Sequence, residues 1–188
     1  MIGQLLKSVL FSAGVALIWS GCKKDEDPVD KPKPIINEEE VITTMKLIFT
    51  DSADASNIKM ATFRDPDGDG GATYDIFDDI VLEANKTWYT NIILLNETAS
   101  PVDTISNEVE EEKNDHRFCY TPTGTSASVT ILDFDDNGYA LGLQSKWITG
   151  AAGNGAMQIE LRHQPGIKDG SCSPGATDID VNFPVVIQ

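Results

Sequence analysis

The feature that most constrains the fold is a series of short runs, beginning at residue 41, in which apolar and polar residues alternate. Residues 41–50 (VITTMKLIFT) and 58–64 (IKMATFR) show the alternation expected of strands with one buried face. Similar runs follow at 80–82, 87–96, 117–121, 128–134, 143–149, 157–163 and 179–187. About eight or nine strands at this spacing predict an all-β protein, an immunoglobulin-like antiparallel β-sandwich.

One segment has a helical pattern. In residues 104–115 (TISNEVEEEKND), Ile105 and Val109 lie four apart and glutamates surround them. An apolar stripe this narrow predicts either a short acidic surface helix or a loop. Because no helices of 10–15 residues separate the strands, a doubly wound parallel sheet is disfavoured. Pro184 lacks an amide donor, which predicts an edge or bulge position in the last strand.

The first 21 residues have the pattern of a lipoprotein signal peptide. Lys7 precedes an apolar stretch over 9–19, which is short for a membrane span of about 20 residues. Small residues then lead to Cys22 and resemble a bacterial lipobox, which predicts cleavage before Cys22 and its lipidation. Acyl chains would anchor the protein, since each buried methylene contributes about 0.8 kcal/mol. The alternative is a retained membrane anchor.

Residues 22–40 are predicted to form a disordered tether that joins Cys22 to a single β-sandwich domain over 41–188. Pro28, Pro32 and Pro34 prevent regular structure, and the charges resist collapse. Two lysines followed by acids behind Cys22 resemble the export signal of surface lipoproteins in Bacteroidota. The predicted location is therefore the outer membrane, facing the cell surface or, alternatively, the periplasm. A formal net charge of −16 makes nucleic acid an unsuitable partner.

Two Asp-rich turns have the spacing of calcium loops, D-x-D-x-D-G and D-x-D-x-N-G. Their candidate ligands are Asp65, Asp67 and Asp69 in the first turn and Asp133, Asp135 and Asn137 in the second. Neither turn has the bidentate glutamate of an EF-hand, because Ile76 and Gln144 occupy that position. The alternative interpretation is a pair of solvated turns, which favour the same residue types.

The chain has two histidines, and alternation places both on the core side of a strand end. His116 and His163, with Glu111 and Glu112 before the first of them, would suit a zinc or copper site if they lay close together. The alternative is two separate, hydrogen-bonded core histidines.

Cys119 and Cys172 remain once Cys22 is set aside. In an oxidising envelope they either form a disulfide or stay as free thiols. A bridge closing a loop of about 50 residues would stabilise the fold by roughly 4 kcal/mol.

Motifs of catalysis are missing from the sequence: it contains no G-x-S-x-G, no H-E-x-x-H and no Walker-type loop. We therefore do not expect an enzyme.

Several blocks resemble one family. The segments TFRDPDGDGG, LLNET, EVEEEKNDHRFCY, LGLQSKWITG, IELRHQPGIKDG and TDIDVNFPVVI are similar to those of small Bacteroidota outer-membrane lipoproteins of undetermined activity. Such proteins often accompany TonB-dependent receptors, so the resemblance implies a receptor partner and no catalytic residues. Relatives are sometimes described as having a type 1 periplasmic-binding fold, but its two doubly wound lobes need more helices than this chain offers.

Two functions stay open. The first is a membrane-anchored, non-catalytic binding or accessory module, serving a TonB-dependent uptake receptor, with calcium-structured Asp loops. The alternative is a lipoprotein that captures a transition metal with His116, His163 and the neighbouring glutamates.

Overall fold

The structure is a computed structural model that describes residues 40–67 and 73–188. The predicted signal peptide, Cys22, the tether up to residue 39 and Asp69 lie outside the described residues. No helix in the part of the chain that is described is long and apolar enough to cross a membrane.

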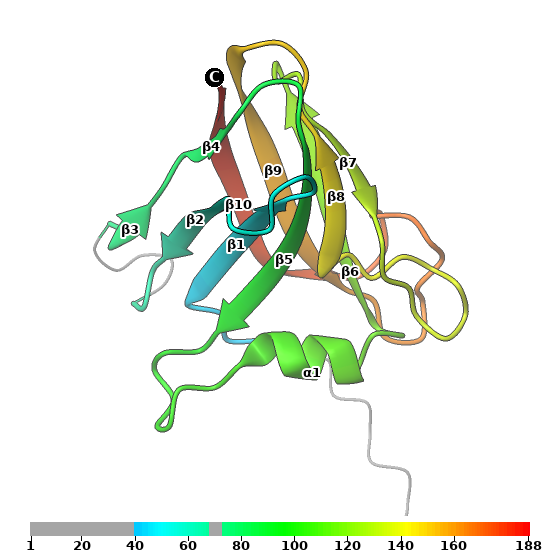
Figure 1. The fold of residues 1–188 in the computed structure, drawn as a ribbon. Coiled ribbons are helices and arrows are strands. Elements are labelled where there is room, and N and C mark those ends of the chain that lie inside the picture. The colour runs from blue at the N-terminus through cyan, green and yellow to red at the C-terminus, as the bar shows by residue number, and fades with distance from the viewer. Residues whose placement is uncertain (1–39, 68–72) are drawn as a thin grey trace, which may run out of the picture. The chain divides into compact units, whose positions relative to one another are not determined.

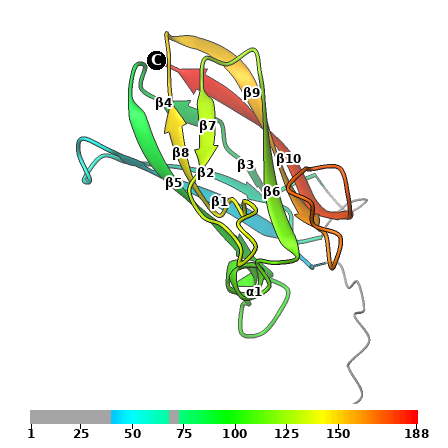
Figure 2. The ribbon, with the colours of Figure 1, turned by 90° about the vertical axis from the view of Figure 1, so that its right-hand side faces the viewer.

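The described residues form two β-sheets with one helix at their end (Figures 1 and 2). The six-stranded sheet has the order β3 (Ile76–Phe77), β2 (Ile58–Arg64), β1 (Thr44–Asp51), β5 (Thr87–Leu95), β8 (Gln144–Ile148), β7 (Ser128–Ile131). The four-stranded sheet has the order β4 (Ile80–Leu82), β10 (Ala176–Ile187), β9 (Gly153–His163), β6 (His116–Thr123). All pairings are antiparallel except that between β10 and β4. The predicted all-β sandwich is confirmed.

The core lies between the two sheets, and strand alternation fills it. In β1, Met45, Leu47 and Phe49 are buried, and they alternate with side chains that face outward. Phe49 meets Trp147 of β8 edge to face, with ring centroids 5.1 Å apart. Full burial of a large apolar side chain contributes about 1.5–3 kcal/mol, so this layer holds the sheets together.

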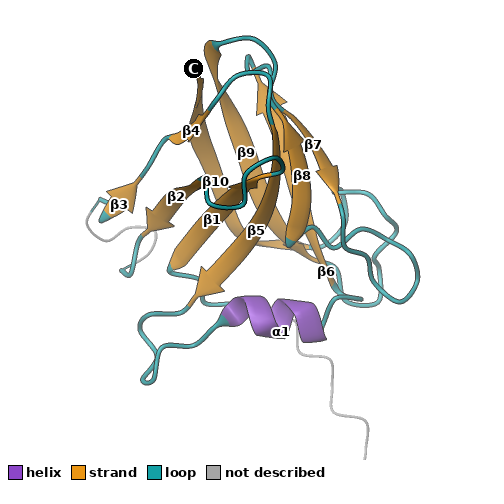
Figure 3. Cartoon of the chain, viewed as in Figure 1, coloured by secondary structure: helices purple, strands orange, loops and turns teal. Residues whose placement is uncertain are grey.

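The acidic segment is a helix, α1 (Ile105–Glu111), coloured purple in Figure 3. It buries Ile105 and Val109 against the core and packs against β5. The narrow apolar stripe thus decides which face of the helix is covered. The helix ends one turn before β6, and this places its C-terminus beside the first residue of that strand, His116.

Strand β10 is an interior strand, with β9 on one side and β4 on the other. Pro184 faces Ala156 of β9, while pairing with β4 begins only at Val185. The missing amide of Pro184 therefore costs no bond to β4. Pro184 thus has the predicted edge position locally, although β10 has partners on both sides from Val185 onward, and the bulge of β10 lies elsewhere, between Thr177 and Ile179.

Candidate metal centre

His116 and His163 lie directly opposite each other in the β6–β9 ladder. Their rings are stacked, with centroids 4.6 Å apart and planes 7° apart. His116 is fully buried and His163 is 6% exposed. The predicted inward orientation is confirmed, and the register of the two strands brings the side chains together.

The hydrogen bond of His116 fixes the state of its ring. Nδ1 lies 3.2 Å from the backbone carbonyl oxygen of Glu112. Because a carbonyl can only accept, Nδ1 carries the proton and Nε2 of the neutral ring carries a lone pair. Nε2 is buried and has no hydrogen-bond partner among the described residues, as is also true of Nδ1 of His163. A histidine that donates one N–H to a carbonyl and has no hydrogen bond at its other nitrogen has the arrangement of a metal ligand.

Burial, with a smaller contribution from the neighbouring His163, lowers the pKa of His116 to about 4, although the hydrogen bond to Glu112 and the charge of Asp115 act in the opposite direction. The ring is therefore neutral at pH 7. A neutral imidazole is the form that binds a metal ion.

Glu112 is the predicted carboxylate that reaches the histidines. One ligand atom each from Glu112, His116 and His163 lie within 4.8 Å of one another. Glu112 caps the C-terminus of α1, and its side chain is exposed. Glu111 is the last residue of the helix and does not belong to this group, because successive helical side chains point in different directions.

Further carboxylates surround the centre. Burial and the nearby charges of Asp178 and Glu112 raise the pKa of Glu40, while His163 lowers it. Burial also raises the pKa of Glu108, with a contribution from Glu40. Burial is the main cause of both shifts and the neighbouring carboxylates add to it, so a bound cation would offset part of the negative charge here.

Asp178 is a neighbour of the His116 ring that the sequence pattern did not predict. Its Oδ2 lies 3.8 Å from Nε2 of His116, and its side chain is fully buried. Strict alternation with the buried Ile179 would place Asp178 on the outer face of the sheet. No local signal in the sequence marks the bulge that turns it inward.

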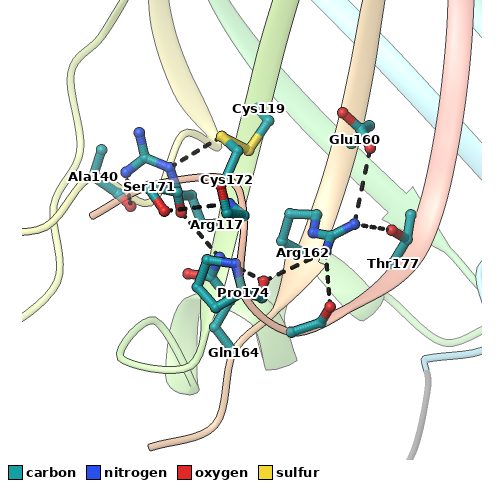
Figure 4. The surroundings of a disulfide bond; sticks show 12 residues. Arg117, Cys119, Ala140, Glu160, Arg162, Gln164, Ser171, Cys172, Pro174 and Thr177 are labelled. Carbon is teal, nitrogen blue, oxygen red and sulfur yellow. Dashed lines mark hydrogen bonds and ion pairs between the residues drawn. A yellow bond between two sulfur atoms is a disulfide. The ribbon is translucent and has the colours of Figure 1, made fainter. Parts of the chain in front are cut away.

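The loop over 164–175 supports the centre, because it joins His163 at the end of β9 to the start of β10. Nε2 of Gln164 donates to the carbonyls of Ser171 and Pro174, both at 3.0 Å (Figure 4). Cys172 forms a disulfide with Cys119 of β6, with Cα atoms 6.1 Å apart. The loop is thus covalently attached to the strand that begins at His116.

The second Asp-rich turn uses its carboxylates internally. Both oxygens of Asp133 accept from backbone N–H groups, at 2.8 and 3.1 Å. Oδ1 of Asp135 accepts from the backbone N–H groups of Asn137 and Tyr139, each at 2.8 Å. Oδ2 of Asp135 lies 2.9 Å from Nζ of Lys168. These bonds close the turn and account for its spacing without calcium.

The first Asp-rich turn follows β2. Asp65 and Asp67 are described, and the backbone N–H of Asp65 donates to Thr43 at 2.8 Å. Since Asp69 is outside the described residues, calcium binding at this turn stays a prediction.

No protein-family model, curated protein or solved structure matches this chain. The resemblance to Bacteroidota lipoproteins, the receptor partner and the lipid anchor therefore stay predictions.

Proposed function

We propose that the protein is a non-catalytic, membrane-anchored module that binds a divalent transition metal through His116, His163 and Glu112. The observation that carries this proposal is the buried, stacked histidine pair, with the lone pair of His116 Nε2 held available by the Glu112 carbonyl. Imidazole nitrogen and carboxylate oxygen suit Zn²⁺ and Cu²⁺.

The distances support a site that closes around the ion. A tetrahedral zinc ion with bonds of 2.0–2.2 Å holds its ligand atoms about 3.3–3.6 Å apart. Since the three ligand atoms lie within 4.8 Å of one another, the side chains need to draw together by up to roughly 1.5 Å. Glu112 is exposed, so it can make this movement and also provide a path of entry.

The anchored part of the proposal rests on the signal-like segment 1–21 and on Cys22. A metal-binding domain tethered at the outer membrane would hold ions close to an uptake receptor. The predicted receptor partner and the proposed metal binding are compatible, because a metal-binding domain anchored at the membrane could present its ion to a receptor in the same membrane.

Isothermal titration calorimetry of the purified chain with Zn²⁺, after treatment with a chelator, tests the proposal. We expect one ion per chain with a Kd of about 1 μM or tighter. Glu112→Gln should weaken binding by at least about tenfold, because it removes a charged ligand. Glu111→Gln is the matched control, since it removes the adjacent charge of the same helix without touching the centre.

The chain contains only two histidines, His116 and His163, so any zinc binding that depends on histidine must come from this pair. His163→Asn should reduce zinc binding to a weak, non-specific level. Zinc affinity that is unchanged in His163→Asn, or equal losses in the two glutamate variants, would contradict the proposal.

A further inference from the structure

The starting observation is a groove on the side of the sandwich where both sheets end. β6 is the last strand of the four-stranded sheet, and β7 is the last strand of the six-stranded sheet. The two strands are consecutive in the chain and are joined by residues 124–127 (Figure 2). Side chains of both strands, together with Cys172, line a groove of about 420 Å³, which we call the edge groove. Its volume falls within the range of small-molecule sites, roughly 300–1,000 Å³.

Much of the edge groove is apolar. Tyr120, Val129 and Ile131 line it, and each is half-buried. Tyr120 and Val129 also pack against the core, which holds them in place. The hydroxyl of Tyr120 donates to the carbonyl of Gly142 at 2.6 Å, so its hydrogen is already used within the fold. These side chains therefore offer a fixed apolar surface to a ligand.

Arg117 is the one charged side chain among the described residues that line the edge groove. Its Nε lies 3.4 Å from Sγ of Cys172, and its Nη1 lies 3.5 Å from the carbonyl oxygen of Ala140 (Figure 4). The contact to Ala140 is long for a hydrogen bond, and sulfur is a weak acceptor. Because a guanidinium has five N–H donors, most of its bonding capacity remains for a ligand or for solvent.

Arg117 also differs from the other two arginines of the chain. Arg64 pairs with two carboxylates, and Arg162 lies 4.0 Å from a carboxylate oxygen of Glu160. In the part of the chain that is described, Arg117 forms no ion pair, although the sequence has 30 acidic residues. Burial lowers the pKa of Arg117, and the charge of Asp169 acts in the opposite direction. The guanidinium stays protonated at pH 7, so a partly desolvated positive charge faces an apolar groove.

We propose that the edge groove binds the anion of a fatty acid, with the carboxylate on Arg117 and the alkyl chain along Tyr120, Val129 and Ile131. A guanidinium matches a carboxylate through two parallel N–H···O bonds. The formal net charge of −16 repels anions in general, so burial of the alkyl chain must supply much of the affinity. The edge groove shares no residue with the metal centre, so this site goes beyond the proposed function and is tested separately from it.

A peptide strand fits these edges less well than a fatty acid does. Strand addition takes its affinity from backbone hydrogen bonds along a free edge. Pro122 of β6 lines the groove and has no amide to donate. The backbone N–H of Phe118 already donates to the carbonyl of Leu141 at 2.6 Å, and β7 has only four residues. Recognition at this edge therefore falls to the side chains of the groove.

The experiment titrates the full chain with decanoate in a calorimeter and compares Arg117→Gln with Lys146→Gln. Lys146 is the matched control, because it is half-buried and positively charged like Arg117 but lies on β8 and does not line the groove. Arg117→Gln should weaken decanoate binding on the order of 10–100-fold, because the hydrogen bonds to the charged carboxylate are lost. Lys146→Gln should leave the Kd within about twofold of the parent chain.

Variation of the ligand separates a binding site from a structural role of Arg117. Decanol has the same alkyl chain without the charge, so it should bind the parent chain about as weakly as decanoate binds Arg117→Gln. Acetate has the carboxylate without the chain and should give no measurable heat. From hexanoate to decanoate, each methylene that reaches the apolar surface should tighten binding by up to about fourfold. Arg117→Lys keeps the charge but loses the planar fork, so its Kd should fall between those of the parent chain and Arg117→Gln.

Unchanged decanoate affinity in Arg117→Gln, or equal losses in Arg117→Gln and Lys146→Gln, would overturn the proposal. Equal affinity of the parent chain for decanoate and decanol would overturn it as well, as would a parent chain that binds no decanoate. Thermal melting without ligand shows whether each variant is folded. If Arg117→Gln does not fold, the comparison of decanoate with decanol in the parent chain decides the outcome. None of these results depends on zinc, so the failure of this inference leaves the proposed function standing.

Discussion

At the residue scale, His116 makes the stability of the metal-free protein depend on pH. Its folded-state pKa of about 4 lies below the ordinary value of 6.5, mainly because of burial. Between these values the unfolded chain binds a proton that the folded chain does not, so stability falls as the pH drops from 6.5 toward 4. The full effect is on the order of 3 kcal/mol. Urea unfolding of the chelator-treated protein at pH 7 and pH 5 measures it.

His116→Asn is the control for this pH effect, because Asn can still donate to the Glu112 carbonyl but does not titrate. The pKa values of Glu40 and Glu108 are raised, so their protonation stabilises the fold as the pH drops and opposes the effect of His116. Glu40 and Glu108 are present in the parent chain and in His116→Asn, as are the charges of Asp115, Asp178 and Lys168. The difference between the two chains therefore reports on His116. An equal loss of stability on acidification in the two chains would contradict the prediction.

Gly175 is a second residue on which the centre depends. It has a φ of +85°, and a Cβ there would lie 2.0 Å from the backbone oxygen of His163. Gly175→Ala should therefore lower the free energy of unfolding by about 1–3 kcal/mol because of this clash, in addition to the cost of placing alanine at a positive φ. The variant should also weaken zinc binding, because the clash displaces His163.

Gly166→Ala is the matched control for Gly175→Ala. Gly166 belongs to the same loop and has a φ of +68°, but nothing lies within 4 Å of its Cβ position. Gly166→Ala should lower the free energy of unfolding only by the roughly 1–2 kcal/mol that alanine costs in the left-handed conformation, and it should leave the zinc Kd unchanged. Denaturant unfolding and calorimetry of both variants check this, and similar losses in both would argue against a steric role for Gly175.

At the element scale, the sequence predicted most strands because alternation is a local property. It missed β3, whose two residues, Ile76 and Phe77, are too short to show a period. It predicted that His116 and His163 face inward, but their closeness depends on the β6–β9 register, which a local pattern does not encode. The inward orientation of Asp178 could not be predicted, because a bulge changes the face of one residue and leaves the surrounding alternation intact.

The disulfide acts on elements rather than on single residues, because it joins β6 to the loop over 164–175. Cys119 and Cys172 are 53 residues apart in sequence. Replacing both by Ser should lower the free energy of unfolding by about 4 kcal/mol, chiefly because the unfolded chain gains freedom. Urea unfolding under non-reducing conditions measures this, with the parent chain in excess reductant as the control. A double variant as stable as the oxidised parent chain would contradict the expected contribution.

At the scale of the whole molecule, the acidic charge and the metal centre belong together. The chain has 30 acidic and 14 basic residues. A negative field of this size attracts cations from a distance and raises their local concentration. The centre adds nitrogen ligands and a buried position, which select among those cations. In the proposed function, the general charge would bring ions to the surface, and His116 with His163 would give preference to transition metals.

Zinc should therefore stabilise the whole fold. An ion that binds only the folded state adds about 2.7 kcal/mol at a free concentration of 100 times its Kd. For a domain of this size, that corresponds to a rise in Tm of roughly 5–10 °C. Differential scanning calorimetry with buffered free zinc measures the shift, and His163→Asn should abolish it. A calcium-induced shift that survives in His163→Asn would report instead on the Asp-rich turn after β2, so the same scans separate the two predicted cation sites. An equal zinc shift in the parent chain and in His163→Asn would exclude the histidine centre as the source.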